Sequence, residues 1–216
     1  MSDRMRAGAG CIIMLPRVGK EEKLSALSEL RAYWGALAPQ PGIVPPRLAV
    51  QPRAIEGALA AAFLAERVGP GQVRLRIAGR NLVEALGREP RNLPLSTLLT
   101  VEAKLEAADL IEQVFAEPAV VELDLGCEGA RARLLLMPLT DYLGQVTMML
   151  GGFAMESGEA PGAPGRFRLA GRQVTRLPGV SVTQPGCFAL EGIRAAAEAP
   201  APFRGAPPGL VHSRED

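Results

Sequence analysis

Several residue types on which enzymes and cofactor-binding proteins depend are scarce in this chain. Its 216 residues include one histidine, His212, and three cysteines, and aromatic residues make up only 4%. A single histidine near the end of the chain excludes a histidine-dependent catalytic triad or a histidine metal cluster within the core. The cysteines Cys11, Cys127 and Cys187 show no paired spacing. We therefore expect a reduced, cytoplasmic protein without a zinc site.

Net charge and long hydrophobic runs are also lacking. The formal net charge is +1, which gives no reason to expect nucleic acid or an anionic membrane as a partner. No apolar run approaches the roughly 20 residues of a membrane helix, and no secretory cleavage site follows the apolar residues 12–15. The chain does have 48% hydrophobic and 22% charged residues, the balance of a globular protein with one ample core.

Alternation of apolar and charged residues is clearest in the stretch 72–87. Residues 73–78 alternate apolar residues with arginine, as in a half-buried strand, and a short helix ending at Gly87 is expected to follow. A Gly-Pro-Gly turn precedes this strand, so residues 63–68 should pair with it as a hairpin. The pattern predicts a strand that runs directly into a short helix.

Two longer helices are predicted on either side of this unit. The first spans residues 21–37, and a proline-rich connector follows it. The second spans about residues 100–115. Its apolar residues recur at helical spacing: Val101, Leu105, Ala108, Ile111 and Phe115.

Four further strand-like runs lie at 121–125, 130–139, 146–153 and 166–174. Adjacent hairpins argue for an antiparallel sheet with helices on one face, which is an α+β fold. The expected sheet domain is accompanied by an N-terminal helix and a C-terminal extension.

The chain is expected to divide into four segments. Residues 1–20 form a flexible N-terminus and residues 21–38 the N-terminal helix. Residues 39–174 form the sheet domain. Residues 175–216 form an extension and a tail rich in alanine, proline and glycine.

Any ligand pocket should be lined by residues on the inward faces of the predicted strands and helices. These residues are expected to form one continuous apolar core. The candidates are Phe63, Leu75, Ile77, Leu82, Leu86, Phe115, Leu136 and Met148.

The first helix carries an apolar stripe whose residues are spaced three, four and three apart, namely Leu27, Leu30, Trp34 and Leu37. One interpretation is a helix packed on its own domain. The other is a helix that projects from the core and pairs with a second copy, because an exposed stripe needs a cover. The second interpretation predicts a homodimer whose interface includes this stripe.

Two other motifs suggest chemistry but have simpler explanations. Arg76 and Arg80 have the RxxxR spacing of the cyclic-di-nucleotide receptors of the PilZ family. The companion segment of those receptors is missing, so exposed arginines on a strand are favoured. Gly151 and Gly152 lie inside a predicted strand and indicate a bulge or a close backbone contact more than a phosphate site.

A set of short motifs follows one order along residues 24–174: Leu30-Arg31-Ala32-Tyr33-Trp34, Pro45-Pro46-Arg47, Pro52-Arg53-Ala54-Ile55, Arg76-Ile77-Ala78-Gly79 and Leu86-Gly87. In this order and spacing they resemble the fifth subgroup of PAS domains, an alphaproteobacterial family once catalogued as a domain of unknown function. Gln51 stands where that family commonly has an aspartate. The resemblance implies a five-stranded antiparallel sheet with helices over one face and a pocket between them.

The resemblance also allows cofactors to be considered one by one. Flavin photoreceptors of the PAS type need a cysteine after a Gly-Arg-Asn segment, and here Leu82 follows Gly79-Arg80-Asn81. Haem-binding types generally use a histidine in the helical block, where this chain has none. We therefore expect neither flavin nor haem, and no metal.

The leading hypothesis is a non-catalytic sensory or regulatory PAS protein in a signalling pathway. It would act through a small apolar ligand, a signalling protein partner or homodimerisation. The alternative is a small-molecule binding protein or an enzyme that uses the PAS pocket. A cyclic-di-nucleotide receptor using Arg76 and Arg80 is the least favoured hypothesis.

Overall fold

The computed structural model describes residues 20–38, 40 and 42–177, and the side chains from residue 25 onward. The segments predicted as a flexible N-terminus and a loose tail therefore lie almost entirely outside the described residues. The described residues form one sheet of six strands: β1 (Ala62–Gly69), β2 (Gln72–Ala78), β3 (Ala119–Cys127), β4 (Ala130–Thr140), β5 (Val146–Ser157) and β6 (Arg168–Arg176).

The strand order is β2-β1-β5-β4-β3-β6, and every neighbouring pair is antiparallel. Short hairpins join β1 to β2, β3 to β4 and β4 to β5, and the first of them is the hairpin predicted from the Gly-Pro-Gly turn. The α+β class and the antiparallel sheet are thus confirmed. The additional strand predicted at 166–174 is β6, which extends the sheet beyond β3.

One face of the sheet is covered by α2 (Arg80–Leu86), the 3-10 helix η3 (Leu95–Leu98) and α3 (Val101–Ala116). Gly87 ends α2 with φ at 64°, a left-handed conformation that glycine adopts without steric cost, and its N–H donates to the carbonyl of Val83. Asn81, one residue into α2, donates a side-chain hydrogen bond to the carbonyl of Phe153 at 3.1 Å. This bond ties the short helix to the middle of the sheet.

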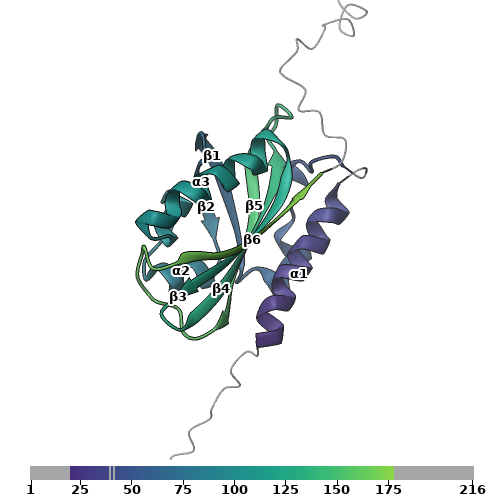
Figure 1. Cartoon of the computed structure of the whole chain (residues 1–216). Coiled ribbons are helices and arrows are strands. Elements are labelled where there is room, and N and C mark those ends of the chain that lie inside the picture. The colour runs from purple at the N-terminus through teal and green to yellow at the C-terminus, as the bar shows by residue number, and fades with distance from the viewer. Residues whose placement is uncertain (1–19, 39, 41, 178–216) are drawn as a thin grey trace, which may run out of the picture. The chain divides into compact units, whose positions relative to one another are not determined.

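The opposite face of the sheet is covered by α1 (Lys20–Leu37), which packs against it together with the 3-10 helix η2 (Pro52–Ala58). Figure 1 shows α1 and α3 on different sides of the sheet. Helices therefore lie on both faces, whereas the sequence predicted helices on one. Leu150 and Leu135, which face α1, are as deeply buried as the residues beneath α3.

The prediction that the α1 stripe projects to bind a second copy is wrong. Leu27, Leu30 and Trp34 are buried against the chain's own sheet, and Leu37 is half-buried. Polar contacts strengthen this packing, because Trp34 Nε1 donates to the carbonyl of Pro138 at 2.8 Å. A homodimer remains a prediction, but this stripe does not provide its interface.

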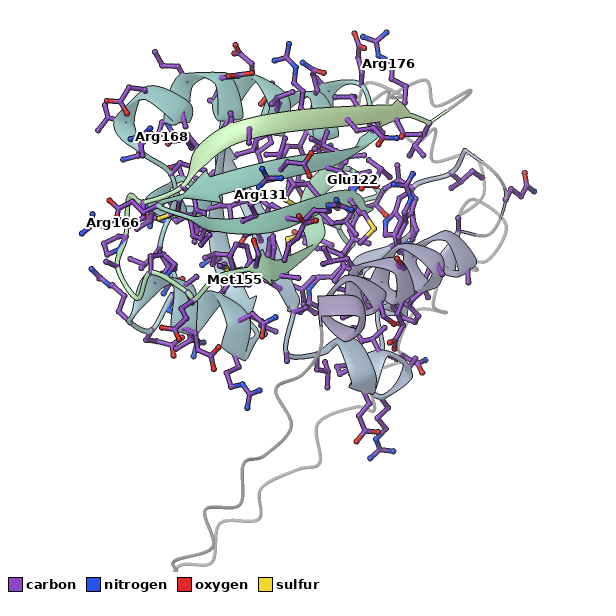
Figure 2. All side chains as sticks on the ribbon, turned by 60° about the horizontal axis from the view of Figure 1, so that its bottom comes forward. Glu122, Arg131, Met155, Arg166, Arg168 and Arg176 are labelled. Carbon is purple, nitrogen blue, oxygen red and sulfur yellow. The ribbon has the colours of Figure 1, made fainter. Side chains whose placement is uncertain are left out.

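Polar side chains also hold α1 on the sheet. Arg31 forms an ion pair with Glu122 of β3, which lies on the α1 side of the sheet (Figure 2). The amide of Gln51 donates to the hydroxyl of Tyr33 at 2.6 Å. These contacts connect α1 to β3 and to the segment before η2, which are far apart in the sequence.

The predicted apolar stripe of α3 is only partly correct. Val101 and Leu105 are 74% and 80% exposed. The small residues Ala103 and Ala107 face the sheet instead, followed by Leu110, Ile111, Val114 and Phe115. Alanines at the first turns allow the helix backbone to approach the strands closely, so larger residues lie outside the contact.

A carboxylate organises the turn between β4 and β5. Asp141 accepts hydrogen bonds from the hydroxyl of Thr147 at 2.8 Å and from the amides of Gln145 at 3.0 Å and Leu143 at 2.8 Å. Burial raises the pKa of Asp141, but these three hydrogen bonds outweigh it and hold the pKa below its ordinary value.

Replacing Asp141 with asparagine should destabilise the protein in a pH-dependent way. A carboxyl with a lowered folded-state pKa stabilises the fold fully above its unfolded pKa, about 3.9, and loses that contribution as the pH falls through the lower folded value. Urea unfolding should show a stability difference between wild type and Asp141→Asn that is constant above about pH 5 and shrinks below about pH 4.

Asp109→Asn, at an exposed carboxylate on α3, is the matched control and should show no comparable trend. A difference for Asp141→Asn that stays constant or grows as the pH falls would contradict the role given to this turn.

Candidate functional site

Most of the predicted pocket residues come together between the sheet and the helices α2 and α3. They belong to one buried cluster, which also contains residues of η3 and of all five strands β1 to β5. The predicted residues found there are Phe63, Leu75, Leu82, Leu86, Phe115 and Leu136.

Aromatic side chains fill the centre of this cluster. The ring of Phe63 lies directly over Gly151, where a Cβ atom would overlap the ring. Phe153 and Phe167 meet edge to face with ring centroids 5.7 Å apart, and both are fully buried. The inward-facing positions thus serve as packed core, and the side chains crowd this space (Figure 2).

Ile77 does not belong to this cluster, because a bulge in β2 reverses the side on which it lies. Leu75 pairs with Ala65, but Ile77 pairs with Leu64, so Arg76 is an extra residue in the ladder. The alternation predicted from Val73 and Leu75 therefore ends at the bulge. Ile77 is 57% exposed on the face of the sheet that carries α1.

Met148 is also misplaced in the prediction. It is buried in a second apolar cluster, which lies between the sheet and the helices α1 and η2. There it pairs with Glu66 of β1 and Leu139 of β4. Its neighbour Met149 faces the interior instead. Both methionines lie in an apolar run that lacks alternation, so the sequence could not show which of the two faces inward.

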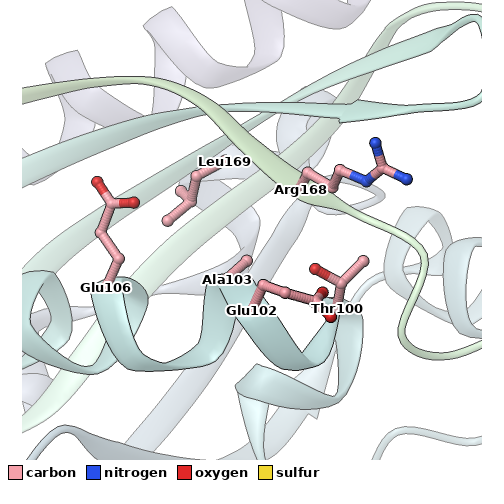
Figure 3. A pocket seen from close by; sticks show the side chains of 6 residues that line it. All are labelled: Thr100, Glu102, Ala103, Glu106, Arg168 and Leu169. Carbon is pink, nitrogen blue, oxygen red and sulfur yellow. The ribbon is translucent and has the colours of Figure 1, made fainter.

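A surface pocket of about 460 Å³ lies where α3 begins, between that helix and β6 (Figure 3). Its charges are largely compensated. Glu106 forms an ion pair with Arg172 at 2.7 Å. Hydrogen bonding at the backbone amide of Glu102, aided by the charge of Arg168, holds the pKa of Glu102 below its ordinary value. The pocket therefore offers balanced charge and no activated acid or base.

Next to it, a pocket of about 500 Å³ surrounds the turn between β3 and β4. It includes Cys127, a half-buried free thiol, and Arg166, which pairs with Glu128 at 3.7 Å. Arg166, Arg168 and Arg176 extend along this edge of the sheet (Figure 2). No described hydrogen bond joins this thiol to a basic group, so the pocket gives no nucleophile–base pair.

A third surface pocket, of about 460 Å³, lies on the α1 face beside β1 and β2. Arg76 lines it, but Arg80 is not among its lining residues and pairs with Glu84 within α2 at 3.4 Å. The two arginines of the RxxxR motif thus belong to different surroundings. The pocket therefore gives no support to a cyclic-di-nucleotide site shared by the two arginines.

Two further observations limit the chemistry of the described residues. They contain no group of three or more histidine, cysteine, aspartate or glutamate side chains able to hold a metal ion. None of the described helices is both long and apolar enough to span a lipid bilayer.

The structure thus defines an α+β domain in which an antiparallel sheet carries short helices over a packed interior, with a separate helix on its other face. A family model described as PAS domain matches residues 22–154, the part of the chain from α1 to β5. The chain therefore belongs to the PAS domain family, and membership indicates a sensory or regulatory role. Neither a curated protein nor a solved structure matches the chain.

Replacing Gly151 with alanine should destabilise the protein by about 1–3 kcal/mol, because the new methyl group would overlap the buried ring of Phe63. Gly35→Ala is the matched control, since a Cβ there meets no atom within 4 Å. Urea unfolding measures both changes.

The contact itself is tested by a double-mutant cycle. In a Phe63→Leu background, Gly151→Ala should cost clearly less, because the smaller side chain leaves room for the methyl group. Additive costs for the two substitutions would show that the ring does not lie over Gly151.

Proposed function

We propose that this chain is a non-catalytic regulatory PAS module of the cytoplasm that acts through contact with another protein, without a resident cofactor. The observation that carries the proposal is the packed interior. Phe63, Phe153 and Phe167 are each no more than 1% exposed, and they occupy the space between the sheet and the helices. A PAS domain whose interior is filled by its own side chains has no space there for a ligand, so regulation acts through its outer surface.

The residue at the position of the photoreactive cysteine supports the absence of flavin. Leu82 follows Gly79-Arg80-Asn81, is 1% exposed and packs in the interior cluster. Asn81 uses its side-chain amide to bind the carbonyl of Phe153. In this segment, Leu82 is therefore part of the packed interior, and the Asn81 side chain is bonded to β5.

An enzyme that uses the interior is the weaker alternative. The interior cluster consists of hydrophobic side chains, and no described polar or charged residue is fully buried. General acid–base catalysis needs a titratable group whose surroundings adjust its pKa. The groups with shifted pKa values, Glu102 and Asp141, lie at a helix start and in a hairpin turn.

Native mass spectrometry of freshly purified full-length protein tests this proposal. The expected spectrum shows the mass of the polypeptide, or twice that mass for a homodimer, with no added mass, and the solution should have no visible absorption. A stoichiometric extra mass that is released on denaturation, or visible absorption that survives gel filtration, would contradict a cofactor-free module.

A further inference from the structure

The pocket on the α1 face of the sheet differs from the other two in its charge. It lies between the 3-10 helix η1 (Arg47–Ala49), the hairpin of β1 and β2, the loop before η3, and β5. Its volume is about 460 Å³. We name it the Arg76 pocket; it is lined by Arg47, Leu64, Glu66, Arg76, Ile77, Arg91, Asn92 and Met148.

Positive charge is in excess in the Arg76 pocket. Arg76 is already engaged, since its Nε donates to Glu66 at 2.6 Å and its Nη1 to Asn92 Oδ1 at 2.9 Å. Arg47 and Arg91 are exposed, and neither forms an ion pair with any residue that the structure describes. Among the lining residues, one carboxylate therefore faces three guanidinium groups, and the nearby Glu89 accepts only from the backbone amide of Arg91, at 3.3 Å.

Apolar side chains lie beside these arginines. Ile77 is 57% exposed, Leu64 is half-buried, and Met148 reaches the pocket from β5. The bulge at Arg76 is the cause, because it turns Ile77 from the interior to the open face. Bulges commonly re-aim a side chain in this way next to functional sites.

The wall of the pocket is held in place by backbone hydrogen bonds. The amide of Leu75 donates to Leu93 at 2.9 Å, and the amide of Asn92 donates to Leu75 at 2.7 Å. Asn92 has φ at 64°, the left-handed conformation that non-glycine residues seldom adopt. These bonds attach the loop to the outer edge of β2, so the backbone of Arg91 is held beside Arg76 and the apolar patch.

We propose that the Arg76 pocket docks an acidic segment of a partner protein, with an apolar side chain on Ile77 and Leu64 and flanking carboxylates on Arg47 and Arg91. Guanidinium groups bind carboxylates through paired, charge-assisted hydrogen bonds, and the apolar anchor adds burial. The pocket is open to the surface, which suits a segment of a protein chain more than an enclosed small molecule. This inference rests on the proposed function, because it names the surface through which the module acts.

Other occupants fit the pocket less well. A neutral apolar ligand would leave both unpaired guanidinium groups without partners, and a basic segment would be repelled. Nucleic acid binding needs a broad basic surface, whereas here Glu66 lies within the pocket and the chain has a net charge of +1.

Selection of a random peptide library on the immobilised full-length chain tests the proposal. Enriched peptides should share an apolar residue flanked by aspartate or glutamate. A synthetic peptide of that consensus should bind wild type and lose at least about tenfold in affinity for the Arg47→Glu, Arg91→Glu double variant, because two attractive charges become repulsive. The Ile77→Ser variant should bind the same peptide more weakly than wild type does.

Arg131→Glu, at an exposed arginine of β4 outside the pocket, is the matched control and should bind like wild type. Amide shift changes in NMR spectra should locate the bound peptide at residues 76–77 and 91–92. Urea unfolding checks that each variant remains folded, which is expected because the substituted side chains are exposed.

Two results would overturn this inference, and they have different consequences for the proposed function. Peptides that bind equally well to wild type and to the double variant would refute the Arg76 pocket as the docking site. The proposed function, contact with another protein, would still stand. Failure to enrich any peptide would refute docking of an acidic segment, and a small-molecule adduct that the double variant loses in native mass spectra would refute the proposed function as well.

Discussion

The centre of β5 carries two adjacent glycines, and each allows a different layer of the protein to approach the sheet. Successive residues of a strand face opposite sides. Gly151 faces the interior, beneath the ring of Phe63, and Gly152 faces α1, where a Cβ would lie 2.5 Å from Leu27 Cδ2 and 2.9 Å from Leu30 Cδ1. A side chain at either position would displace one of the layers, so the packing on both faces depends on this pair.

This arrangement is the reason why we propose that regulation acts through the outer surface. On one face the aromatic residues fill the interior, and on the other α1 covers the middle of the sheet. The end of the α1 face at β1 and β2 is less covered, and there the bulge places Ile77 beside unpaired arginines. This end of the α1 face is therefore the part of the sheet that is left exposed.

Local pattern was sufficient to predict the strands, hairpins and main helices. Alternation and turn residues predicted the hairpin of β1 and β2, and Gly87 predicted the end of α2. These features could be predicted because a hairpin and a helix end both depend on neighbouring residues in the chain. Those signals cannot show which face of the sheet a distant helix covers. The position of α1 is determined by tertiary contacts, such as the hydrogen bond between Trp34 and Pro138.

The candidate site was harder to predict than the fold, for identifiable reasons. The bulge at Arg76 shifts the face of every later residue in β2, and no local signal indicated it, so Ile77 was assigned to the interior. The Arg76 pocket also depends on Arg47 and Arg91, which lie on separate loops brought to β2 by the fold. The sequence did contain the pair Gly151-Gly152, which indicated a bulge or a close backbone contact. The structure shows no register shift there, and side chains of both layers pack directly on the backbone of the pair.

The most direct test of this account is a nuclear Overhauser spectrum of the full-length protein that covers both faces of β5. The account predicts cross peaks from the Phe63 ring protons to the α protons of Gly151, and from the methyl groups of Leu27 and Leu30 to the α protons of Gly152. Absence of the leucine cross peaks, together with rapid amide exchange throughout α1, would contradict it, because α1 would then not be packed on the sheet.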